Sequence, residues 1–290
     1  MTYEDTGPLI EGIQLTQLDK YLFSGQPNAW PSGHVYGGHV LAQSMEAAMN
    51  TVSDSVHFHS MHAYFLRQGK AGRPIVYEVD PIRDGGSFCT RRVVAIQDGV
   101  AIFNTSLSFH KKEEGFSHQV DNVYIDTNPD DYEDDETFYK RHLTKRGLDA
   151  DKLFPSLPFI LRTLDRVNPD DPQPLDPNGG TWVKLKNHHP LNTDANIRML
   201  CYASDFGLMS ACLRPHGMLG RDPRIGQMAS LDHAFYLHDD DFDCNDWLFY
   251  KTEGNWAGGA RVFSRGTFYT REGKMIASTT QEGLVRPKRK

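Results

Sequence analysis

Several features that mark large classes of protein are missing from this sequence of 290 residues. No apolar run approaches the roughly 20 residues that a helix needs to cross a membrane. Residues 1–8 have neither the basic start nor the apolar stretch of a secretory signal. No Gly-x-Ser-x-Gly run occurs, so the sharp turn that presents the serine in one large class of Ser-His-Asp hydrolases is not expected. These absences predict an intracellular protein without a membrane span.

Cysteine is scarce as well, and its spacing is not that of a metal site. The four cysteines are Cys89, Cys201, Cys212 and Cys244, and no two of them form the close pair that is typical of zinc sites. We therefore expect free thiols in a reducing compartment and no bound metal. The net charge of −7 argues against a general nucleic-acid binder, although it leaves room for a local basic patch that holds a polyanionic ligand.

What is present is the composition of a globular protein and an internal repeat. Hydrophobic residues make up 39% of the chain and charged residues 24%, and the length suits two domains. The difference in residue number between matched stretches of the two halves grows slowly along the chain, as small loop insertions after a duplication would cause. The alternative is ordinary α+β patterning that occurs twice. The matched stretches are Tyr36 with Tyr202, residues 62–66 with 233–237, and residues 98–102 with 272–276.

Each half has the pattern of one buried helix followed by several strands. In the first half, Gly37 and Gly38 open a stretch with apolar and small residues at helical spacing, which predicts a helix of about four turns. In the second half the helix is predicted over residues 205–213. Helix and strands segregated in this way predict an α+β fold in which an antiparallel sheet wraps around a central helix. The predicted strands cover residues 59–66, 75–79, 87–96, 101–109, 228–237, 247–253, 260–269 and 275–285.

The middle of the chain differs from both halves. It contains an acidic stretch and a stretch rich in turn-forming residues, at residues 126–136 and 168–180, which together predict loop and linker with one short helix near residues 136–145. The expected organisation is an N-terminal domain of residues 1–118 with a degenerate site, a linker of residues 119–189, and a C-terminal domain of residues 190–290 with the working site.

Three polar residues of the second half stand in contexts that the first half repeats in altered form. They are Asp205 in Tyr-Ala-Ser-Asp, Ser230 in Ala-Ser-Leu-Asp-His, and Gln281 in Ser-Thr-Thr-Gln. The first-half counterparts read Tyr-Gly-Gly-His, Ser-Met-His and Asn-Thr-Ser-Leu, ending at His39, His62 and Leu107. One half therefore keeps polar groups that can hold and activate a water molecule. A duplicated fold with one working site follows from this difference.

A set of longer runs carries a resemblance to a known family. In the first half they are VYGGHV from Val35, HAYFLR from His62 and RDGGSF from Arg83, and in the second half YASD from Tyr202, LRPHG from Leu213, SLDH from Ser230, RGTFY from Arg265 and QEG from Gln281. Over nearly the whole chain the sequence resembles the type II acyl-CoA thioesterases. This resemblance implies a double hotdog fold, an acyl-CoA substrate that is hydrolysed to fatty acid and CoA, and a homodimer or homotetramer.

The same resemblance implies that Asp205, Ser230 and Gln281 are catalytic, with no cofactor. A thioester carbonyl can be attacked by a water that a hydroxyl and an amide hold and a carboxylate deprotonates. Backbone N–H groups at a helix start would stabilise the negative charge on the carbonyl oxygen, and Asp205 is expected at such a start. Taken singly, Asp205 also fits an N-cap and Ser230 an ordinary strand serine. His62 and His233 are expected at equivalent, structural positions of the two repeats.

Three arginines are candidates for contacts with the CoA phosphates. Arg67 and the pair Arg91 and Arg92 carry the charge that phosphate recognition needs, but solvated surface arginines are the alternative interpretation. Two other functions stay open, a hotdog enoyl-CoA hydratase or dehydratase and a non-catalytic acyl-CoA-binding protein. The run Asp194-Ala-Asn196 lacks the proline and histidine expected of a hydratase.

The end of the sequence bears on the compartment. Peroxisomal members of the family end in a Ser-Lys-Leu type signal, whereas this sequence ends Arg-Pro-Lys-Arg-Lys. We therefore expect a cytoplasmic protein, with the peroxisomal matrix as the alternative.

Overall fold

The structure is a computed structural model, and it describes residues 5–27, 33–121, 124, 126–154, 156–220 and 222–289. Residues 1–4 and Lys290, on which part of the expected location rests, lie outside the described residues. The helices are α1 (Gly7–Ile13), α2 (Gly37–Met49), α3 (Asp135–Lys145), α4 (Ala150–Leu153) and α5 (Thr193–Ala203), with the 3₁₀ helices η1 (Pro129–Asp131) and η2 (Leu208–His216). The strands are β1 (Thr16–Asp19), β2 (Leu22–Gly25), β3 (His57–Phe65), β4 (Ile75–Asp84), β5 (Phe88–Gln97), β6 (Val100–His110), β7 (Phe159–Thr163), β8 (Asn178–Leu185), β9 (Ile225–Ser230), β10 (Asp232–Leu237), β11 (Leu248–Gly258), β12 (Arg261–Thr270) and β13 (Met275–Pro287).

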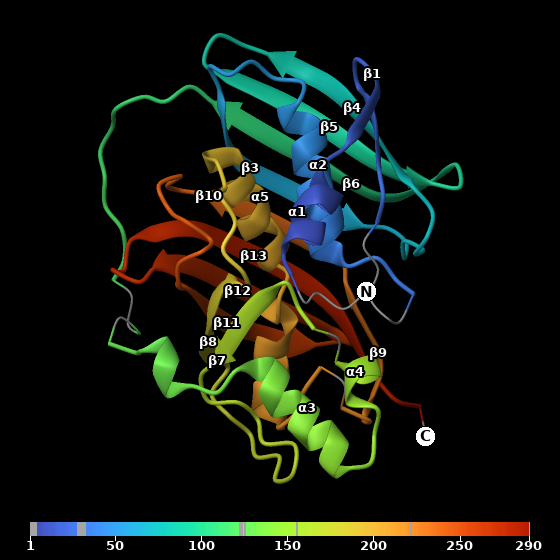
Figure 1. Cartoon of the computed structure of the whole chain (residues 1–290), viewed down its shortest axis with the longest axis vertical. Helices are drawn as coiled ribbons and strands as arrows, with labels where there is room; N and C mark the ends of the chain where they lie inside the picture. Colours follow the sequence, from blue (N-terminus) through green and yellow to red (C-terminus); the bar gives the residue numbers. More distant parts are fainter. Residues whose placement is uncertain are drawn as a thin grey trace.

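The strands form one continuous antiparallel sheet whose two halves meet at β3 and β10. The strand order is β1-β2-β4-β5-β6-β3-β10-β13-β12-β11-β8-β7, and β9 pairs with β13 beside this path. Figure 1 shows the first half of the sheet in blue to green above the second half, which runs from yellow-green to red. Pairing of β3 with β10 joins one edge of each half, so those two edges are no longer open to other chains.

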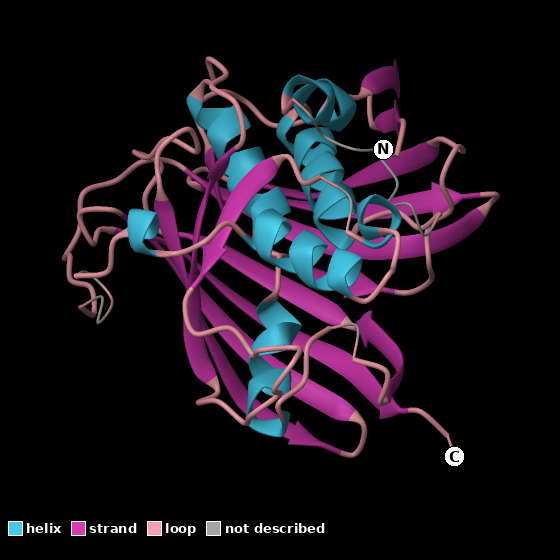
Figure 2. Cartoon of the chain, turned by 60° about the horizontal axis from the view of Figure 1, so that its bottom comes forward, coloured by secondary structure: helices cyan, strands magenta, loops and turns pink. Residues whose placement is uncertain are grey.

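Each half of the sheet holds its own helix. Helix α2 packs on β4, β5 and β6, and η2 packs on β11, β12 and β13, while α5 lies against α2. Figure 2 shows the helices gathered on one face of the curved sheet. Two half-sheets that each wrap around a helix are the double hotdog that the sequence resemblance implied, so the predicted α+β class is confirmed.

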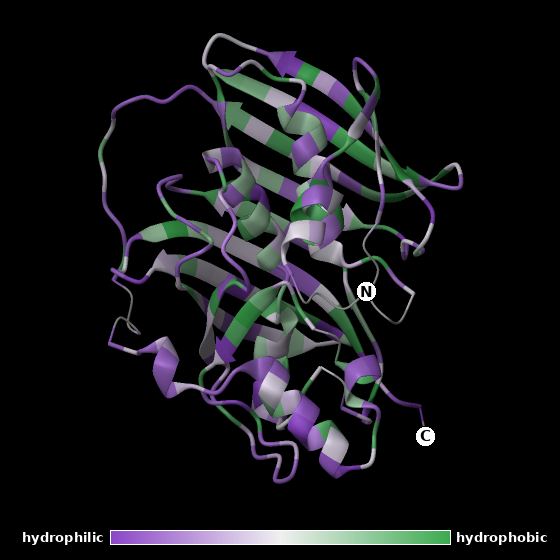
Figure 3. Ribbon diagram, viewed as in Figure 1, coloured by the Kyte–Doolittle hydropathy of each residue, from purple (hydrophilic) through white to green (hydrophobic). Residues whose placement is uncertain are grey.

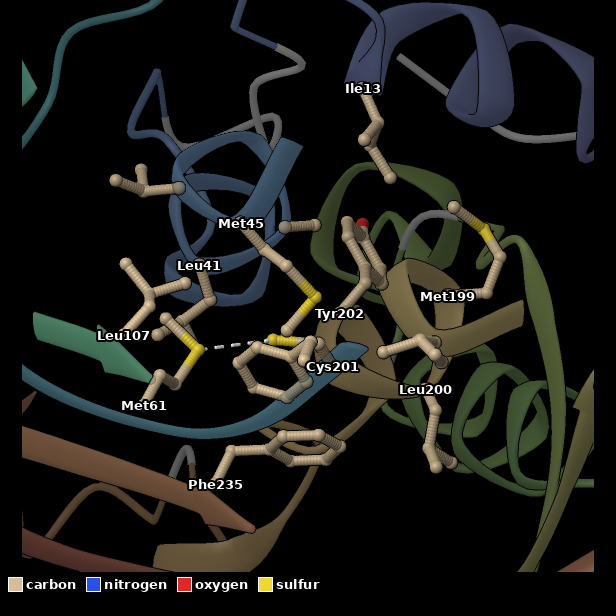
Figure 4. Close-up of a cluster of buried hydrophobic side chains, with 14 of the residues drawn as sticks. Ile13, Leu41, Met45, Met61, Leu107, Met199, Leu200, Cys201, Tyr202 and Phe235 are labelled. Atoms are coloured by element: carbon tan, nitrogen blue, oxygen red, sulfur yellow. Dashed lines mark hydrogen bonds between the residues drawn. The ribbon is translucent and has the colours of Figure 1, made fainter. Parts of the chain in front are cut away.

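The alternation of side chains along the strands explains why the sheet has a core on one face. Hydrophobic and hydrophilic residues alternate along many strands in Figure 3, as the period of two predicts. Along β5 the side chains of Cys89, Arg91, Val93 and Ala95 are buried, and those at the alternate positions are more exposed. Apolar side chains of α2, α5, β3 and β10 meet behind this face in the cluster of Figure 4.

The centre of that cluster is rich in sulfur. Met45 of α2 and Met61 of β3 lie beside Cys201 of α5, whose thiol is 3.6 Å from the Met61 sulfur. Burial raises the pKa of the Cys201 thiol. All four cysteines are free and buried, in agreement with the expectation of free thiols. Among the described residues, no helix combines the length and apolarity needed to span a bilayer.

The second-half helix differs from its prediction. An α-helix is present before residue 205, because the Asn192 side chain accepts the Ala195 N–H at 2.8 Å and starts α5 earlier in the chain. Gly207 adopts a left-handed conformation, with φ of 66°, and the following helix η2 begins only at Leu208. The expected helix start at Asp205 was therefore wrong, since this residue lies in the turn between α5 and η2.

Two further segments differ from expectation. The strand predicted over residues 228–237 is divided at Leu231, because β9 and β10 pair with β13 in registers that differ by one residue. Within residues 119–189, expected as linker, α3 is present as predicted, but β7 and β8 also occur there and extend the second half-sheet beyond β11. The stretch of turn formers hid β8, which begins inside it.

His62 and His233 are not at equivalent positions. They lie on neighbouring antiparallel strands, where the side chain of His62 is exposed and that of His233 is only 1% exposed. Side chains point to opposite faces of a strand in turn, so an alignment that is out of phase by one residue matches an inward side chain with an outward one. The sequence alignment of residues 62–66 with 233–237 has this error.

Candidate active site

Asp205, Ser230 and Gln281 come together around one amide group. The Gln281 Nε2 atom donates to the Asp205 Oδ1 atom at 2.7 Å and to the Ser230 Oγ atom at 3.0 Å. A carboxylate only accepts hydrogen bonds, so the NH₂ side of the amide must face it, and its two hydrogens serve the two partners. Gln281 is 1% exposed, whereas Asp205 and Ser230 are partly exposed. The amide is thus a fixed support for two groups that remain within reach of a ligand.

The second oxygen of Asp205 is bound by the other half of the molecule. The Gly38 N–H, in the first turn of α2, donates to Asp205 Oδ2 at 3.1 Å. The residue before α2 is Tyr36, whose side chain does not cap the helix, so Asp205 supplies the acceptor that an N-cap residue would normally provide. The positive end of the helix dipole also favours the carboxylate. Asp205 therefore caps a helix, as one interpretation of the sequence allowed, but the helix is α2 of the other half of the chain.

Two glycines make this approach of α2 to Asp205 possible. A Cβ atom on Gly37 would lie 2.6 Å from Asp205 Oδ2 and 3.0 Å from Cε1 of Phe65. A Cβ atom on Gly38 would lie 2.2 Å from the carbonyl oxygen of Tyr202. Any side chain at either position would push the helix start away from the carboxylate. The site is consequently composite, with the helix start from the first half and the polar side chains from the second.

A change of strand register accompanies the approach of Ser230, whose partner on β13 is Gly283, to the Gln281 side chain. Ser230 ends β9, and the chain resumes its pairing with β13 at β10, after the break at Leu231. The Asp232 carboxylate accepts the Glu282 N–H at 2.7 Å across this break, and the Leu231 N–H donates to the Glu282 carbonyl. These bonds hold the irregular stretch of β9 and β10 against the strand that carries Gln281.

The carboxyl group of Asp205 has an unusual proton affinity. Burial raises its pKa from the ordinary value to about 6, although the hydrogen bonds from Gln281 and from the Gly38 N–H act in the opposite direction. At neutral pH the group is therefore ionised but close to its titration range. A base with a pKa near the working pH combines the correct charge state with a useful affinity for a proton.

The three arginines expected to bind phosphate lie in different surroundings. Arg91 is 3% exposed, and its guanidinium is engaged by Thr51, Asp84 and backbone carbonyls. Arg92 is exposed and pairs with a surface carboxylate, that of Asp80. Arg67 is exposed and donates to the Ala101 carbonyl at 2.9 Å. Of the three, Arg67 is nearest in the chain to the site, since it follows the strand that carries Phe65.

Sequence reasoning missed the part that the first half contributes. The pair Gly37-Gly38 predicts a helix start, but two adjacent glycines at the start of a helix also indicate a close approach of backbone to another group. It also missed the buried tyrosine Tyr250, whose hydroxyl bonds to the residue before Asp205. No local motif marks that residue. Among the described residues, no cluster of three or more His, Cys, Asp or Glu is arranged to hold a metal ion.

Comparison with known proteins places both halves in one family. The family models of the acyl-CoA thioesterase N-terminal domain and of the acyl-CoA thioesterase C-terminal domain match residues 26–110 and 127–285. Acyl-CoA thioesterase 2 of Haemophilus influenzae is 32% identical over 281 residues, which cover 96% of this chain and 96% of that protein. Human acyl-coenzyme A thioesterase 8 is 30% identical over 290 residues, covering 95% of this chain and 88% of that protein.

Solved structures agree with the sequence comparison. The crystal structure of the acyl-CoA thioesterase II TesB2 from Mycobacterium marinum superposes with a TM-score of 0.78 at 32% identity, covering 96% of this chain and 98% of that one. A hot dog fold protein from Alicyclobacillus acidocaldarius gives a TM-score of 0.75 at 17% identity, over 95% and 96% of the two chains, which supports the fold alone.

Proposed function

Because this chain belongs to the acyl-CoA thioesterase II family, and is therefore an enzyme that hydrolyses acyl-CoA thioesters, we propose that Asp205, Ser230 and Gln281 are its catalytic residues. The observation that supports this assignment is the single buried amide that bonds both the carboxylate and the hydroxyl. A base with a raised pKa, a hydroxyl and a fixed amide are what the direct attack of water on a thioester requires.

The proposed reaction proceeds in balanced steps. Asp205 takes a proton from a water molecule as the water oxygen forms a bond to the thioester carbonyl carbon. The Ser230 hydroxyl accepts from Gln281, so its own hydrogen is left to donate to a group in the site. The carbon–sulfur bond then breaks, and the CoA sulfur takes up the proton that Asp205 received. The products are a free fatty acid and CoA, and no bond to the enzyme is formed.

Helix α2 would favour the same reaction electrostatically. Its first turn points at the Asp205 carboxylate and contains the Gly38 N–H. Negative charge that develops on the carbonyl oxygen is stabilised by the positive end of a helix. In this proposal the first half supplies the positive end of a helix dipole, and the second half supplies the base.

The substitution Asp205→Asn tests the assignment of the base. Asparagine keeps the size and can still accept from Gln281, so the fold should persist while turnover falls by about 10²- to 10⁴-fold, the range for loss of a general base. Release of free thiol from acyl-CoA is the measurement, with circular dichroism as the check on folding. Full activity of the folded variant would contradict the proposal.

The same assay separates the competing functions. A burst of CoA release with acyl-Ser230 trapped for mass spectrometry would make the serine a covalent nucleophile instead of a water ligand. A change in enoyl absorbance without thiol release would indicate a hydratase. In the structure, Asn196 of the hydratase-like run is a buried helix residue whose side-chain oxygen accepts the Cys244 N–H. Tight binding of acyl-CoA without either signal would indicate a binding protein.

Arg67 is the arginine that we propose for a CoA phosphate. It is exposed, while Arg91 is committed to internal partners and Arg92 to an ion pair. Arg67→Gln is expected to raise KM for acyl-CoA without changing KM for the corresponding acyl-pantetheine, which lacks the nucleotide phosphates. Arg92→Gln, on the same half-sheet, is the matched control. An equal rise of KM for both substrates in Arg67→Gln would contradict a phosphate contact.

Assembly and location are also proposals. A homodimer or homotetramer is expected to give a mass of two or four times 32.9 kDa by light scattering at micromolar concentration, and a monomer mass would count against it.

We propose a cytoplasmic enzyme. The peroxisomal matrix is the alternative, since one relative, 23% identical, is named the peroxisomal acyl-coenzyme A thioester hydrolase 1 of Saccharomyces cerevisiae. Imaging of the tagged protein against a peroxisomal marker decides between the two.

A further inference from the structure

Four buried polar side chains form hydrogen bonds just behind the proposed catalytic residues. They are Ser204, His233, Tyr250 and Thr279, and none is more than 2% exposed. The Tyr250 hydroxyl lies 2.8 Å from the Ser204 carbonyl oxygen and 2.8 Å from Thr279 Oγ1. Ser204 Oγ lies 2.9 Å from His233 Nε2 and donates to the Cys201 carbonyl at 2.7 Å.

The acceptors fix the direction of each of these bonds. A carbonyl oxygen cannot donate, so Tyr250 must give its hydrogen to Ser204, and Thr279 must donate to Tyr250. The Ser204 hydroxyl spends its hydrogen on Cys201, so His233 must donate from Nε2. His233 Nδ1 is buried without a partner, and burial lowers the pKa of this histidine to about 3, which agrees with a neutral ring.

Three members of the group are close in the chain to a proposed catalytic residue. Ser204 directly precedes Asp205, Thr279 lies on β13 with Gln281, and His233 lies on β10 just after the break that follows Ser230. Side chains at alternate strand positions share a face, so Thr279 and Gln281 both point into the core. The hydrogen bonds therefore connect the three segments that must keep their relative positions within a fraction of an ångström.

Space for the tyrosine hydroxyl is provided by a glycine. A Cβ atom on Gly266 would lie 2.4 Å from Thr279 Oγ1 and 2.6 Å from the Tyr250 hydroxyl. The Tyr250 ring is also stacked on Phe268, with ring centres 3.8 Å apart and planes at 3°. The hydroxyl is consequently held in one place, where it meets the Ser204 carbonyl in the turn of Asp205.

We propose that Tyr250 is a positioning residue for the hydrolysis, because its hydroxyl ties the Ser204 carbonyl beside Asp205 to the strand of Gln281. The inference rests on the proposed function, in which Asp205 and Gln281 are catalytic. Asp205 follows the end of α5 and has no regular secondary structure of its own. Without the Tyr250 bond, the turn can rotate and carry the carboxylate away from the amide.

The test compares two buried tyrosines. Tyr250→Phe removes the hydroxyl behind the site, and Tyr77→Phe removes an equally buried hydroxyl that donates to Gln43 Oε1 in the first half. We expect kcat to fall by about 10- to 100-fold in Tyr250→Phe, with KM little changed, because small misplacements of catalytic groups have effects of this size. Tyr77→Phe should lower the melting temperature but leave kcat unchanged.

A pH profile and a second site distinguish positioning from plain stability. The bond from Gln281 lowers the pKa of Asp205, so its loss in Tyr250→Phe should move the acid limb of kcat to higher pH. Thr279→Val, which removes the donor to Tyr250, should lower kcat. Thr279→Ser, which keeps the hydroxyl, should have a kcat close to parental. If Tyr250→Phe does not fold, this pair still decides the question.

The variant Asp205→Asn separates failure of the positioning role from failure of the proposed function. If Asp205→Asn is inactive while Tyr250→Phe and Thr279→Val keep the parental kcat and acid limb, the positioning role is refuted and the proposed function stands. If Asp205→Asn is fully active, the proposed function fails first, whatever Tyr250→Phe shows. Equal losses of kcat in Tyr250→Phe and Tyr77→Phe would also overturn the inference, because a general loss of stability would then explain both.

Discussion

Each half of this molecule buries a polar cluster beside its helix, yet only one cluster has the properties of a catalytic site. In the first half, His39, Gln43 and Tyr77 are fully buried. Gln43 donates to the Gly12 carbonyl at 2.7 Å, and Tyr77 donates to Gln43 at 2.6 Å. Burial lowers the pKa of His39 to about 4, so this ring is neutral. The cluster ties α1 and α2 together and is closed to ligands.

The second cluster differs in charge and in access. Asp205 is a carboxylate whose pKa burial raises to about 6, and both Asp205 and Ser230 are partly exposed. Its supporting residues are as buried as those of the first half. Burial and hydrogen bonding alone therefore do not identify an active site. What distinguishes the second cluster is a charged group near its titration range that a ligand can reach.

Substitution at Gly37 tests most strongly whether the first half is only a scaffold. A Cβ atom there would lie 2.6 Å from Asp205 Oδ2, so Gly37→Ala must displace either the helix start or the carboxylate. We expect turnover to fall by about 100-fold, as for misplacement of a catalytic group. Gly86→Ala is the control, because no atom lies within 4 Å of the added Cβ. Parental turnover in folded Gly37→Ala would show that α2 is not part of the site.

A pair of buried glutamines sharpens the comparison between the clusters. Gln281→Ala should lower turnover by about 10-fold, because Asp205 and Ser230 lose their common support. Gln43→Ala, in the first half, should lower the melting temperature and leave turnover close to parental. Residues that act as a unit are not additive, so Gln281→Ala should add little to Asp205→Asn. Equal effects of both alanine substitutions on turnover would remove the distinction between the clusters.

The sequence predicted those parts of the fold that depend on local patterns. Helix α2 and the strands β3, β5 and β6 were predicted close to their observed bounds, because glycine pairs, alternation and turn residues mark them. Strand β4 was predicted to end at residue 79, whereas it continues to Asp84. The strand β8 was hidden because it begins inside the stretch of turn formers. The alignment of His233 with His62 was wrong, because similarity of sequence does not determine which face of a strand a side chain occupies.

The sequence predicted candidate residues for the site but not its architecture. The family resemblance selected Asp205, Ser230 and Gln281, and the structure brings these three together. The resemblance did not indicate that the helix start beside Asp205 comes from the other half of the chain. Nor does a sequence show that Tyr250 reaches the turn of Asp205, since that contact joins β11 to a segment 46 residues earlier in the chain.

The acid limb of the pH–rate profile tests most directly whether Asp205 is the base. The group must be ionised to accept a proton, so kcat/KM should rise with pH through about 6 and fall away below it. An acyl-pantetheine substrate avoids the phosphate monoester of CoA, which titrates in the same range. In Gln281→Ala the limb should move to higher pH, because the lost hydrogen bond lowers the pKa of Asp205. A profile without an acid limb near that pH, or a limb that does not move in the variant, would contradict the account.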